Sequence, residues 1–432
     1  MQDLEEAMAR VRQAARRVPF ADAHRGEASR LARAAAELEV ADEHAGMGMQ
    51  MALAGHPILI ETGDAADDVT IEQGPWGFVL VRVNGKVVSR IDPMNLLFTR
   101  SITVRTKGGN DTVRVRGEVP YALSIQTGAG DDLVFGGSGD ENIHTGAGDD
   151  VVYGGAGHDV INGGTGDDTL FGGSGDDYLS GDSGDDKLYG GDDRDVLSGG
   201  EGDDTIAGQG RDDVVYTGPG VDSVTEDEGV VYAQTGVDSV VGDARVVHVD
   251  HSAVPGNIRL GNDEFSDRIR ADLQTLGSSP EGRRMLEALA DSQHQLTVLD
   301  SQDSWRNSNR LSPDDLPIGS ALSSSDGVLL PDGRPGRGAS ATLHFNPTMQ
   351  SLSAANAYYA GKPWDRLTPI IVLYHELRHA VDILHGRADL RTTDGWPNAE
   401  LDAVGLPAHG VVPPRSENAL RQEMGLPLRP EY

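Results

Sequence analysis

The pattern of apolar and polar positions divides the chain into stretches of different character. Residues 127–225 form eleven consecutive nonapeptides in which the eighth position is always apolar. Residues 57–126 before them alternate with strand periodicity, and Asn84-Gly85 is a hairpin signal between two β-rich runs. Residues 368–386 instead repeat apolar side chains at helical spacing. The pattern therefore predicts a strand-rich repeat region and, well after it, one long helix.

The predicted helix at residues 368–386 has a marked beginning and a marked end. Thr368 is a good N-cap, Pro369 suits the first helical position, and Gly386 suits a left-handed stop. Its apolar stripe consists of Ile370, Leu373, Leu377, Val381 and Leu384. This stripe is expected to face a core, with a polar side opposite it.

A pair of histidines on this helix has the spacing of a metal site. His375 and His379 are four residues apart, so we expect one above the other, on the side away from the apolar stripe. Two neutral imidazoles one turn apart can share a tetrahedral Zn²⁺, and Glu376 can reach a water on the metal rather than the metal itself. This is the H-E-x-x-H arrangement of metallopeptidases; the alternative is a solvated polar face that carries two histidines.

Two residues compete for the third place on such a zinc, which usually has three protein ligands and one position for water. His385 follows His379 at the metzincin spacing, but Asp382 stands where that pattern needs a glycine to turn the chain out of the helix. If the helix continues, His385 points away from the pair. Glu400 opens a plausible second helix lying across the first, and helix geometry favours it as the third ligand.

The nonapeptides follow the pattern G-G-x-G-x-D-x-U-x, the repeat of a calcium-binding parallel β-roll. Two repeats make one turn of a flattened coil, in which the eighth side chain points inward and the glycines permit positive φ. Ca²⁺ takes about six to eight oxygens, which successive turns supply as carboxylates and backbone carbonyls. The sixth-position residues predicted to bind calcium are Asp132, Asp150, Asp159, Asp168, Asp177, Asp186, Asp195, Asp204 and Asp213.

The charge balance agrees with a roll that binds cations. The chain has 36 Lys and Arg against 69 Asp and Glu, and residues 127–225 alone contain 23 acidic and 3 basic residues. Without bound cations such a stack should repel itself and stay largely unfolded. The same charge argues against nucleic acid and anionic membranes as partners. The absence of cysteine excludes disulfides and Cys-ligated metals.

The roll is expected to be a calcium-dependent spacer or folding aid without an activity of its own. Aromatic side chains recur at the ninth position, one full turn apart: Phe135, Tyr153, Phe171 and Tyr189. We expect these rings to stack in a ladder on one side of the roll, with a role in packing. Lys107-Gly-Gly-Asn-Asp-Thr-Val113 is an imperfect first copy of the repeat, and residues 229–250 are expected to close the open edge.

Together these patterns predict a multidomain chain. It consists of a helical N-terminal segment at 1–50, a parallel β-roll at 57–250, and an α+β zincin-like metallopeptidase domain at 256–432. The N-terminal segment is expected to be a helical cap, with secretion machinery or a chaperone as its alternative partner. Neither a secretory signal peptide nor an apolar run long enough for stable membrane insertion is evident.

The C-terminal residues resemble a known family. Residues 375–386, the later Glu400-Leu-x-x-x-Gly405 and residues 416–432 look like the NleD-type family of bacterial effector zinc metallopeptidases. The helix, the later glutamate and a terminal Arg-x-x-Tyr are also similar to clostridial neurotoxin light chains, which are zinc endopeptidases. Residues 127–225 separately resemble the repeats-in-toxin family, whose repeats are usually found outside the cell.

The resemblance implies roles for individual residues. His375, His379 and Glu400 would be zinc ligands and Glu376 the general base. Arg429 and Tyr432 would lie near the scissile carbonyl, where a frayed terminus would otherwise be expected.

The function implied is a toxin or effector, secreted or translocated into a target cell, that cleaves a protein there. The NleD-like relatives act on host mitogen-activated protein kinases, so a host signalling protein is one class of substrate. Two alternatives remain open. One is a serralysin-like secreted metalloprotease that uses His385 as third ligand, although those enzymes place the calcium repeats after the catalytic domain. The other is a non-catalytic calcium-binding surface or adhesion module.

Overall fold

The structure is a computed structural model of the whole chain. It describes residues 58–74, 78–91, 101–117, 119, 121–249, 254–261, 264–300, 334–345, 368–388, 392–393, 396–397, 403–405 and 415–430. The helical segment expected at 1–50 and the site residues Glu400 and Tyr432 lie outside these ranges.

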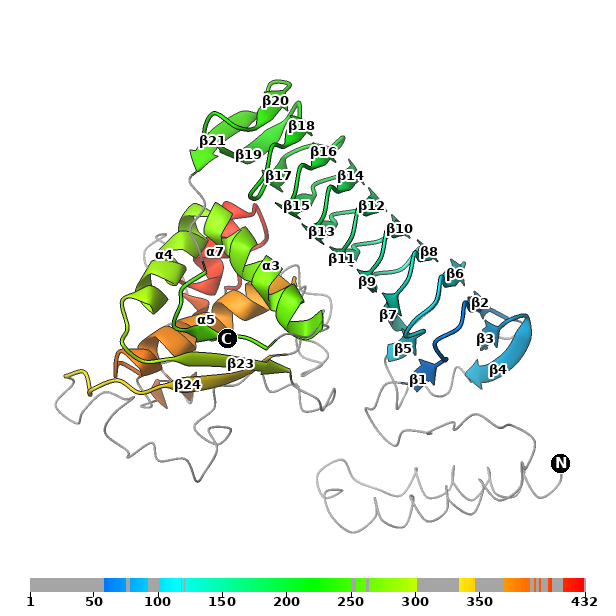
Figure 1. Cartoon of the computed structure of the whole chain (residues 1–432), viewed down its shortest axis with the longest axis horizontal. Coiled ribbons are helices and arrows are strands. Elements are labelled where there is room, and N and C mark those ends of the chain that lie inside the picture. Colours follow the sequence, from blue (N-terminus) through cyan, green and yellow to red (C-terminus); the bar gives the residue numbers. More distant parts are fainter. Residues whose placement is uncertain are drawn as a thin grey trace, which may run out of the picture.

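Two sheets form a long flattened roll from residue 58 to residue 249, and the chain passes from one sheet to the other at successive turns (Figure 1). The first sheet contains, in spatial order, β1 (Ile58–Glu61), β5 (Ser101–Arg105), β7 (Ala122–Ala129), β9 (Glu141–Ala147), β11 (Val160–Thr165), β13 (Tyr178–Ser183), β15 (Val196–Glu201), β17 (Asp213–Tyr216), β19 (Gly229–Gln234) and β21 (Arg245–Val249). The second contains β20 (Ser239–Val241), β18 (Ser223–Thr225), β16 (Thr205–Ala207), β14 (Lys187–Asp192), β12 (Thr169–Ser174), β10 (Val151–Ala156), β8 (Leu133–Phe135), β6 (Thr112–Arg116), β2 (Asp68–Gln73), β3 (Val79–Val83) and β4 (Lys86–Ile91). Within the repeats, each strand pairs in parallel with the strand two repeats later, as Ile161 pairs with Leu179. The predicted parallel β-roll is therefore confirmed.

The eighth-position side chains fill the space between the two sheets. All of them are buried: Val134, Ile143, Val152, Ile161, Leu170, Leu179, Leu188, Leu197, Ile206, Val215 and Val224. Since neighbouring strands lie about 4.7–4.9 Å apart, branched side chains at the same position of each turn stack directly on one another. This row of stacked aliphatic residues is the core of the roll, as the repeat predicts.

The roll begins earlier than its regular repeats. Strands β1, β2, β5 and β6 already pair in parallel with later turns. Strands β3 and β4 form an antiparallel hairpin whose tip residues, Asn84 and Gly85, have φ values of 51° and 76°. Positive φ at both positions is what a two-residue type I′ turn requires, so the predicted hairpin is confirmed. At the other end, β19, β20 and β21 are the last strands of the two sheets.

The predicted aromatic ladder is also present. Phe135, Tyr153, Phe171 and Tyr189 stack in sequence, with ring centroids 5.2, 4.8 and 4.8 Å apart. They lie on the outward side of the second sheet, where Tyr153 is 40% exposed. The ladder therefore packs along the surface of the roll, outside its core.

The C-terminal domain has its helices on one side of a small three-stranded sheet (Figure 1). Its parallel strands are β22 (Ile258–Arg259), β23 (Leu296–Asp300) and β24 (Ala341–Phe345). Its helices are α3 (Glu264–Ser278), α4 (Pro280–Ala290), α5 (Pro369–Leu384) and α7 (Glu417–Glu423). A short antiparallel pair, β25 (Thr392–Thr393) and β26 (Trp396–Pro397), follows α5. Within the described ranges no helix has the length and apolar character needed to cross a membrane.

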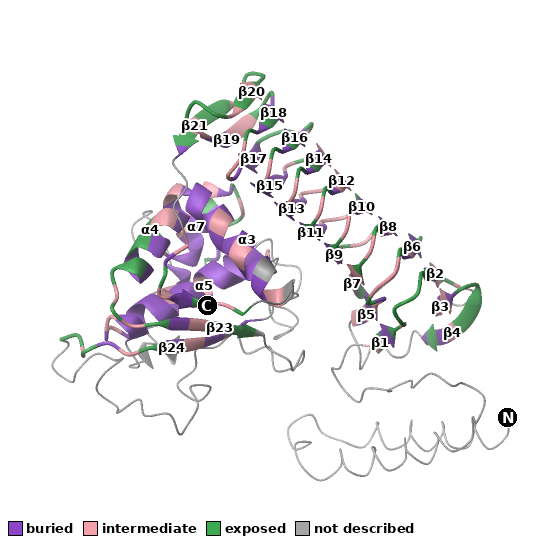
Figure 2. Ribbon diagram, viewed as in Figure 1, coloured by how far each residue is buried: buried purple, intermediate pink, exposed green. Residues whose placement is uncertain are grey.

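Helix α5 is the predicted helix, but its surroundings differ from the prediction. It begins after Thr368 and is followed by Gly386 in the left-handed conformation, with φ of 69°. The apolar stripe is buried as expected, but so are Glu376 and His379 on the other side, at 2% and 4% exposure. The expectation of one core side and one polar outer side is therefore wrong, because α3, α4, α7 and β24 all contact the helix and enclose it (Figure 2).

Candidate functional site

The two histidines of α5 face each other at a distance suited to one metal ion. Nε2 of His375 lies 3.2 Å from Nε2 of His379, and the rings meet edge to face at 75°. Two nitrogens that bind the same tetrahedral zinc at about 2.0–2.1 Å are themselves about 3.3 Å apart. The side chains present therefore fit two ligands of a zinc ion. The described residues contain no group of three His, Asp or Glu side chains around such a point.

The other nitrogen of His375 contacts a buried carboxylate. Nδ1 of His375 lies 3.0 Å from Oε2 of Glu417, the first residue of α7. Ser416 caps α7 by accepting a hydrogen bond from Ala419 N, which fixes the end of the helix where Glu417 sits. A carboxylate bonded to the second nitrogen of a metal-binding histidine sets its tautomer and its ring orientation. Sequence reasoning missed this contact.

Glu417 keeps its charge although it is buried. Its other oxygen accepts a 2.7 Å hydrogen bond from Nε of Arg421, and Arg429 Nη1 lies 3.5 Å from Oε2. Burial alone would raise the pKa of Glu417, but Arg421, the hydrogen bond to His375 and Arg429 outweigh it and hold that pKa well below its usual range. Glu417 and Arg421 thus form an ion pair one helical turn apart, and this pair also supports the histidine.

Arg429 is part of this site and does not fray. Its backbone N donates to Oδ1 of Asn418 at 2.7 Å, and its carbonyl accepts from Nδ2 of the same residue at 2.7 Å. The residue is 4% exposed and contacts Glu417. Arg429 and His375 therefore contact the same carboxylate, that of Glu417. Glu376 follows His375 on α5 and is buried beside the pair.

His385 has another contact. Helix α5 continues past Asp382 to Leu384, and His385 is its C-cap residue. Nδ1 of His385 lies 2.8 Å from the carbonyl oxygen of Val381, and Asp382 pairs with Arg378 at 2.9 Å. The metzincin pattern requires the chain to leave the helix at position 382. Here the helix continues through Asp382 to Leu384.

In the roll, the sixth-position carboxylates form two ladders along the two edges. One oxygen of each carboxylate accepts a hydrogen bond from the backbone N–H of the sixth-position residue one turn earlier. Asp168 N donates to Oδ1 of Asp186 at 2.7 Å, and Asp177 N donates to Oδ1 of Asp195 at 2.8 Å. These ladders include all nine of the aspartates proposed as calcium ligands: Asp132, Asp150, Asp159, Asp168, Asp177, Asp186, Asp195, Asp204 and Asp213.

The second oxygen of each of these aspartates is buried and has no hydrogen-bond partner. This holds for Oδ2 at all nine positions, and also at Asp111 and Asp222. Where the first position of a repeat is glycine, the missing side chain makes room for the carboxylate: a Cβ at Gly163 would lie 2.1 Å from Oδ2 of Asp168 and 3.0 Å from the carbonyl oxygen of Gly181. A bare carboxylate oxygen near a carbonyl from the next turn is the donor set that Ca²⁺ prefers. The residues therefore fit calcium.

Burial makes these carboxylates hard to ionise in the absence of a cation. Desolvation raises the pKa of Asp159 and Asp186 to about 9 and that of Asp168 to about 8. The backbone hydrogen bond to each lowers the pKa, and the neighbouring carboxylates raise it further. A divalent cation is the simplest group that relieves both costs together.

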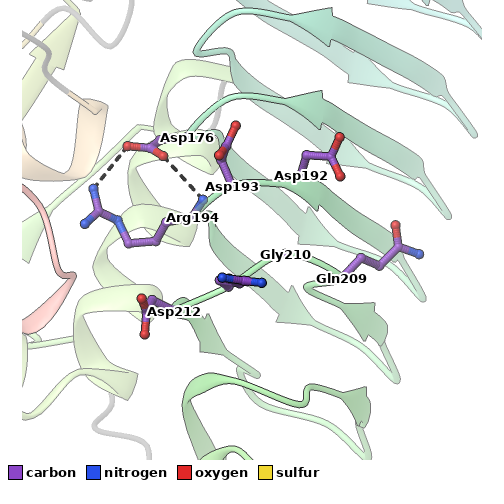
Figure 3. A pocket seen from close by; sticks show the side chains of 8 residues that line it. Asp176, Asp192, Asp193, Arg194, Gln209, Gly210 and Asp212 are labelled. Carbon is purple, nitrogen blue, oxygen red and sulfur yellow. Dashed lines mark hydrogen bonds and ion pairs between the residues drawn. The ribbon is translucent and has the colours of Figure 1, made fainter.

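The two edges are not equivalent. On one edge the fifth-position residues are Asp131, Asp149, Asp167, Asp185 and Asp203, each bonded to the backbone of the next turn. On the other edge the row is Asp140, His158, Asp176, Arg194 and Asp212. Arg194 pairs with Asp176 at 3.1 Å, beside a pocket formed where Asp193 and Arg211 replace fourth-position glycines (Figure 3). This second edge is partly neutralised by its own basic side chains.

Comparison with family models agrees with this division. Residues 256–432 match the model described as Peptidase_M91, effector protein. The model of the RTX calcium-binding nonapeptide repeat matches residues 124–152, 135–170, 153–188, 162–197 and 189–224. Neither the curated proteins nor the solved structures gave a match. The chain is therefore a fusion of RTX calcium-binding repeats with a C-terminal effector domain of the Peptidase_M91 family.

Proposed function

We propose that the C-terminal domain is a zinc endopeptidase, in which His375 and His379 bind the metal. The family match implies peptidase activity. The observation that carries the zinc assignment is the 3.2 Å separation of the two Nε2 atoms, with Glu376 buried beside them. A zinc ion held there would supply Lewis acidity for hydrolysis of a peptide bond.

The residues of the chain have distinct roles in this proposal. Glu376 takes a proton from the attacking water and passes it to the leaving amine. Glu417 fixes the ring of His375 by bonding Nδ1, so that Nε2 stays directed toward His379. Arg429 and Tyr432 are proposed to stabilise the oxyanion, a role that comes from the resemblance to related effector peptidases.

Glu400 remains the proposed third ligand. The observed course of α5 supports it indirectly, because the helix continues through Asp382 and Nδ1 of His385 is bonded to a backbone carbonyl. The serralysin-like alternative, which needs His385 on the metal, is therefore less favoured by the described geometry.

The substrate is proposed to be a protein of a target cell, reached after secretion or translocation. The effector family and the RTX repeats support this location, and a host signalling protein is the substrate class implied by the resemblance. Strand β24 lies at the edge of the described three-stranded sheet and contacts α5. An edge strand can pair with an extended peptide through its free backbone groups, so β24 is the proposed place for the substrate backbone.

The decisive experiment compares wild type with Glu376→Gln. The variant should keep stoichiometric zinc, because the ligands are unchanged, and should lose peptide hydrolysis, because the base is gone. New N-termini in a target-cell lysate treated with wild type but not with the variant would identify the substrate. Equal turnover by both proteins would support the alternative of a non-catalytic calcium-binding module.

A further inference from the structure

The two outward faces of the roll differ in a regular way. On the first sheet, from β11 to β17, the seventh-position side chains are apolar and buried: Val160, Tyr178, Val196 and Val214. On the second sheet, from β12 to β18, the same position holds polar side chains that are partly or fully exposed: Thr169, Lys187, Thr205 and Ser223. We call the first set, with the ninth-position residues beside it, the docking face, and the second set the open face.

Helix α3 of the C-terminal domain covers the docking face. The apolar residues of this face belong to the same buried cluster as Ile269 and Leu273 of α3, and α3 contacts both β13 and β15 (Figure 2). The hydroxyls of Ser198 on the roll and Thr275 on α3 are hydrogen-bonded at 2.7 Å in the buried interface. The roll is therefore a wall of the C-terminal domain, which a simple spacer would not be.

The docking face also contains a buried polar contact. Asp182 occupies a second-position glycine site of the repeat with φ of 78°, a left-handed conformation that is unfavourable for a residue with a side chain. Its carboxylate accepts a 2.6 Å hydrogen bond from Ser180, and its charge acts on the buried pair Arg268 and Asp272 of α3. A strained acidic residue opposite a buried arginine is a feature of an interface, since the repeat itself calls for glycine there.

A second contact reaches α7. Tyr216, buried on the last part of the docking face, donates a 3.1 Å hydrogen bond to Oε1 of Glu423. The other oxygen of Glu423 accepts from the backbone N of Glu281, at the start of α4. On the edge of the roll that contains Asp176 and Arg194, the side chain of Arg194 lies against Gly425, just after α7. The roll therefore contacts the C-terminal end of α7 at two points.

These contacts lead to the histidines. Glu281 accepts a hydrogen bond from the hydroxyl of Tyr374, which precedes His375 on α5. Helix α7, which Tyr216 contacts at Glu423, begins with Glu417, the residue bonded to His375. The Tyr374–Glu281 contact and the Glu417–His375 contact are thus both linked to the docking face, through Glu423 and Tyr216.

From this arrangement we infer that calcium is a regulatory ligand of the C-terminal domain. Calcium folds the roll, and the folded roll provides the surface on which α3 and α7 are held. When calcium is removed, the carboxylate ladders repel, the docking face is lost, and α3 and α7 lose their cover. The control of peptide hydrolysis by calcium rests on the proposed function, whereas the dependence of α3 and α7 on calcium does not.

Thermodynamic linkage makes the coupling reciprocal. If folding of the roll favours docking, then docking favours folding of the roll and raises its apparent calcium affinity by the same factor. A variant that blocks docking must therefore need more calcium to fold its roll, although every calcium ligand is intact.

The test compares two full-length variants, Val196→Asp on the docking face and Thr205→Asp on the open face. Both change the seventh position of neighbouring repeats, add the same charge and leave the interior of the roll untouched. Hydrogen exchange of residues 264–278 and 417–423, and circular dichroism of the roll, are followed during titration with CaCl₂. A second pair, Ser198→Arg and Ala207→Arg, repeats the comparison at the ninth position if Val196→Asp fails to fold.

We expect wild type and Thr205→Asp to gain protection in both helices at the calcium concentration that folds the roll. Val196→Asp should fold its roll at a higher calcium concentration and show little protection in α3. Full protection of α3 and α7 in a chelator, or equal calcium midpoints for the two variants, would overturn the inference. Neither readout needs zinc or substrate, so an inactive peptidase would leave this test intact.

Discussion

Oε2 of Glu417 lies 3.0 Å from Nδ1 of His375, although 42 residues separate the two in sequence. The contact joins the start of α7 to the middle of α5. The carboxylate of Glu417 thereby supports the proposed metal ligand His375, and it also pairs with Arg421. The buried carboxylate of Glu417 therefore contributes both to the stability of the fold and to the proposed binding of the metal.

We predict that Glu417→Gln weakens zinc binding about 10–100-fold, the range seen when the carboxylate partner of a metal-binding histidine is removed. Arg421→Met is the matched variant, because it breaks the same ion pair and leaves the carboxylate beside His375. Zinc affinity is measured by competition with a chelating dye, well below the melting temperature of each variant. Equal zinc affinity for the two would mean that Glu417 serves only the ion pair.

The third ligand gives a second prediction. Glu400→Ala should lose zinc, while His385→Ala should keep it, because Nδ1 of His385 is bonded to the carbonyl of Val381 at the end of α5. Metal content after gel filtration distinguishes them. Zinc retained by Glu400→Ala and lost from His385→Ala would support the serralysin-like alternative.

The space beside the repeat glycines gives a third prediction. In Gly163→Ala the new Cβ would lie 2.1 Å from Oδ2 of Asp168, so the carboxylate must move away from its place near the Gly181 carbonyl. We expect a higher calcium midpoint and a loss of about 1–3 kcal/mol in stability, typical of overpacking. Gly63→Ala is the control, since nothing lies within 4 Å of its Cβ. Similar calcium midpoints for both variants would remove Oδ2 of Asp168 from the calcium site.

The raised pKa values predict how pH acts on the calcium-free roll. The pKa of Asp186 is about 9 and that of Asp204 about 8 in the folded roll, against about 3.9 in an unfolded chain. Between these values the folded state binds more protons than the unfolded state, so stability falls as pH rises through this window.

In a chelator, circular dichroism should therefore show a larger folded fraction of the roll at about pH 6 than at about pH 8.5. With saturating calcium the order should reverse, because protons compete with the cation for the same carboxylates. The same order under both conditions would show that the buried carboxylates do not hold the calcium.

The roll could be predicted from the sequence because its geometry is periodic. The eighth-position residues from Val134 to Val224 repeat at a fixed interval, and one interior environment accounts for all of them. Helix α5 could be predicted because Thr368, Pro369 and Gly386 mark its ends locally. The repeat interval and the helix-end residues are local features of the sequence, so they can be recognised before the fold is known.

Contacts between distant elements could not be predicted in this way. The Glu417–Arg421 pair is a complete local explanation for both residues, so nothing in the sequence pointed to His375. The burial of His379 was missed because the stripe on α5 predicts one core side, while neighbouring helices supply another. The docking face did leave a signal, since Val196 and Thr205 hold the same repeat position with opposite character. A single repeat pattern hides this signal, because alternate repeats lie in different sheets and only one of the two sheets is covered by the C-terminal domain.

The alternation of the two faces limits how this protein can change in length. If a single nonapeptide were deleted between Val196 and Val214, all earlier turns would be inverted relative to the C-terminal domain, and Val196 would point into solvent. Deletion of two nonapeptides from this part of the roll would keep the parity but shift the earlier turns by one strand spacing. Before β9, by contrast, repeats can be gained or lost without moving β13 and β15, the strands that α3 contacts. Evolution of this chain is thus free to lengthen the distal end of the roll and is constrained to even numbers of repeats near the peptidase.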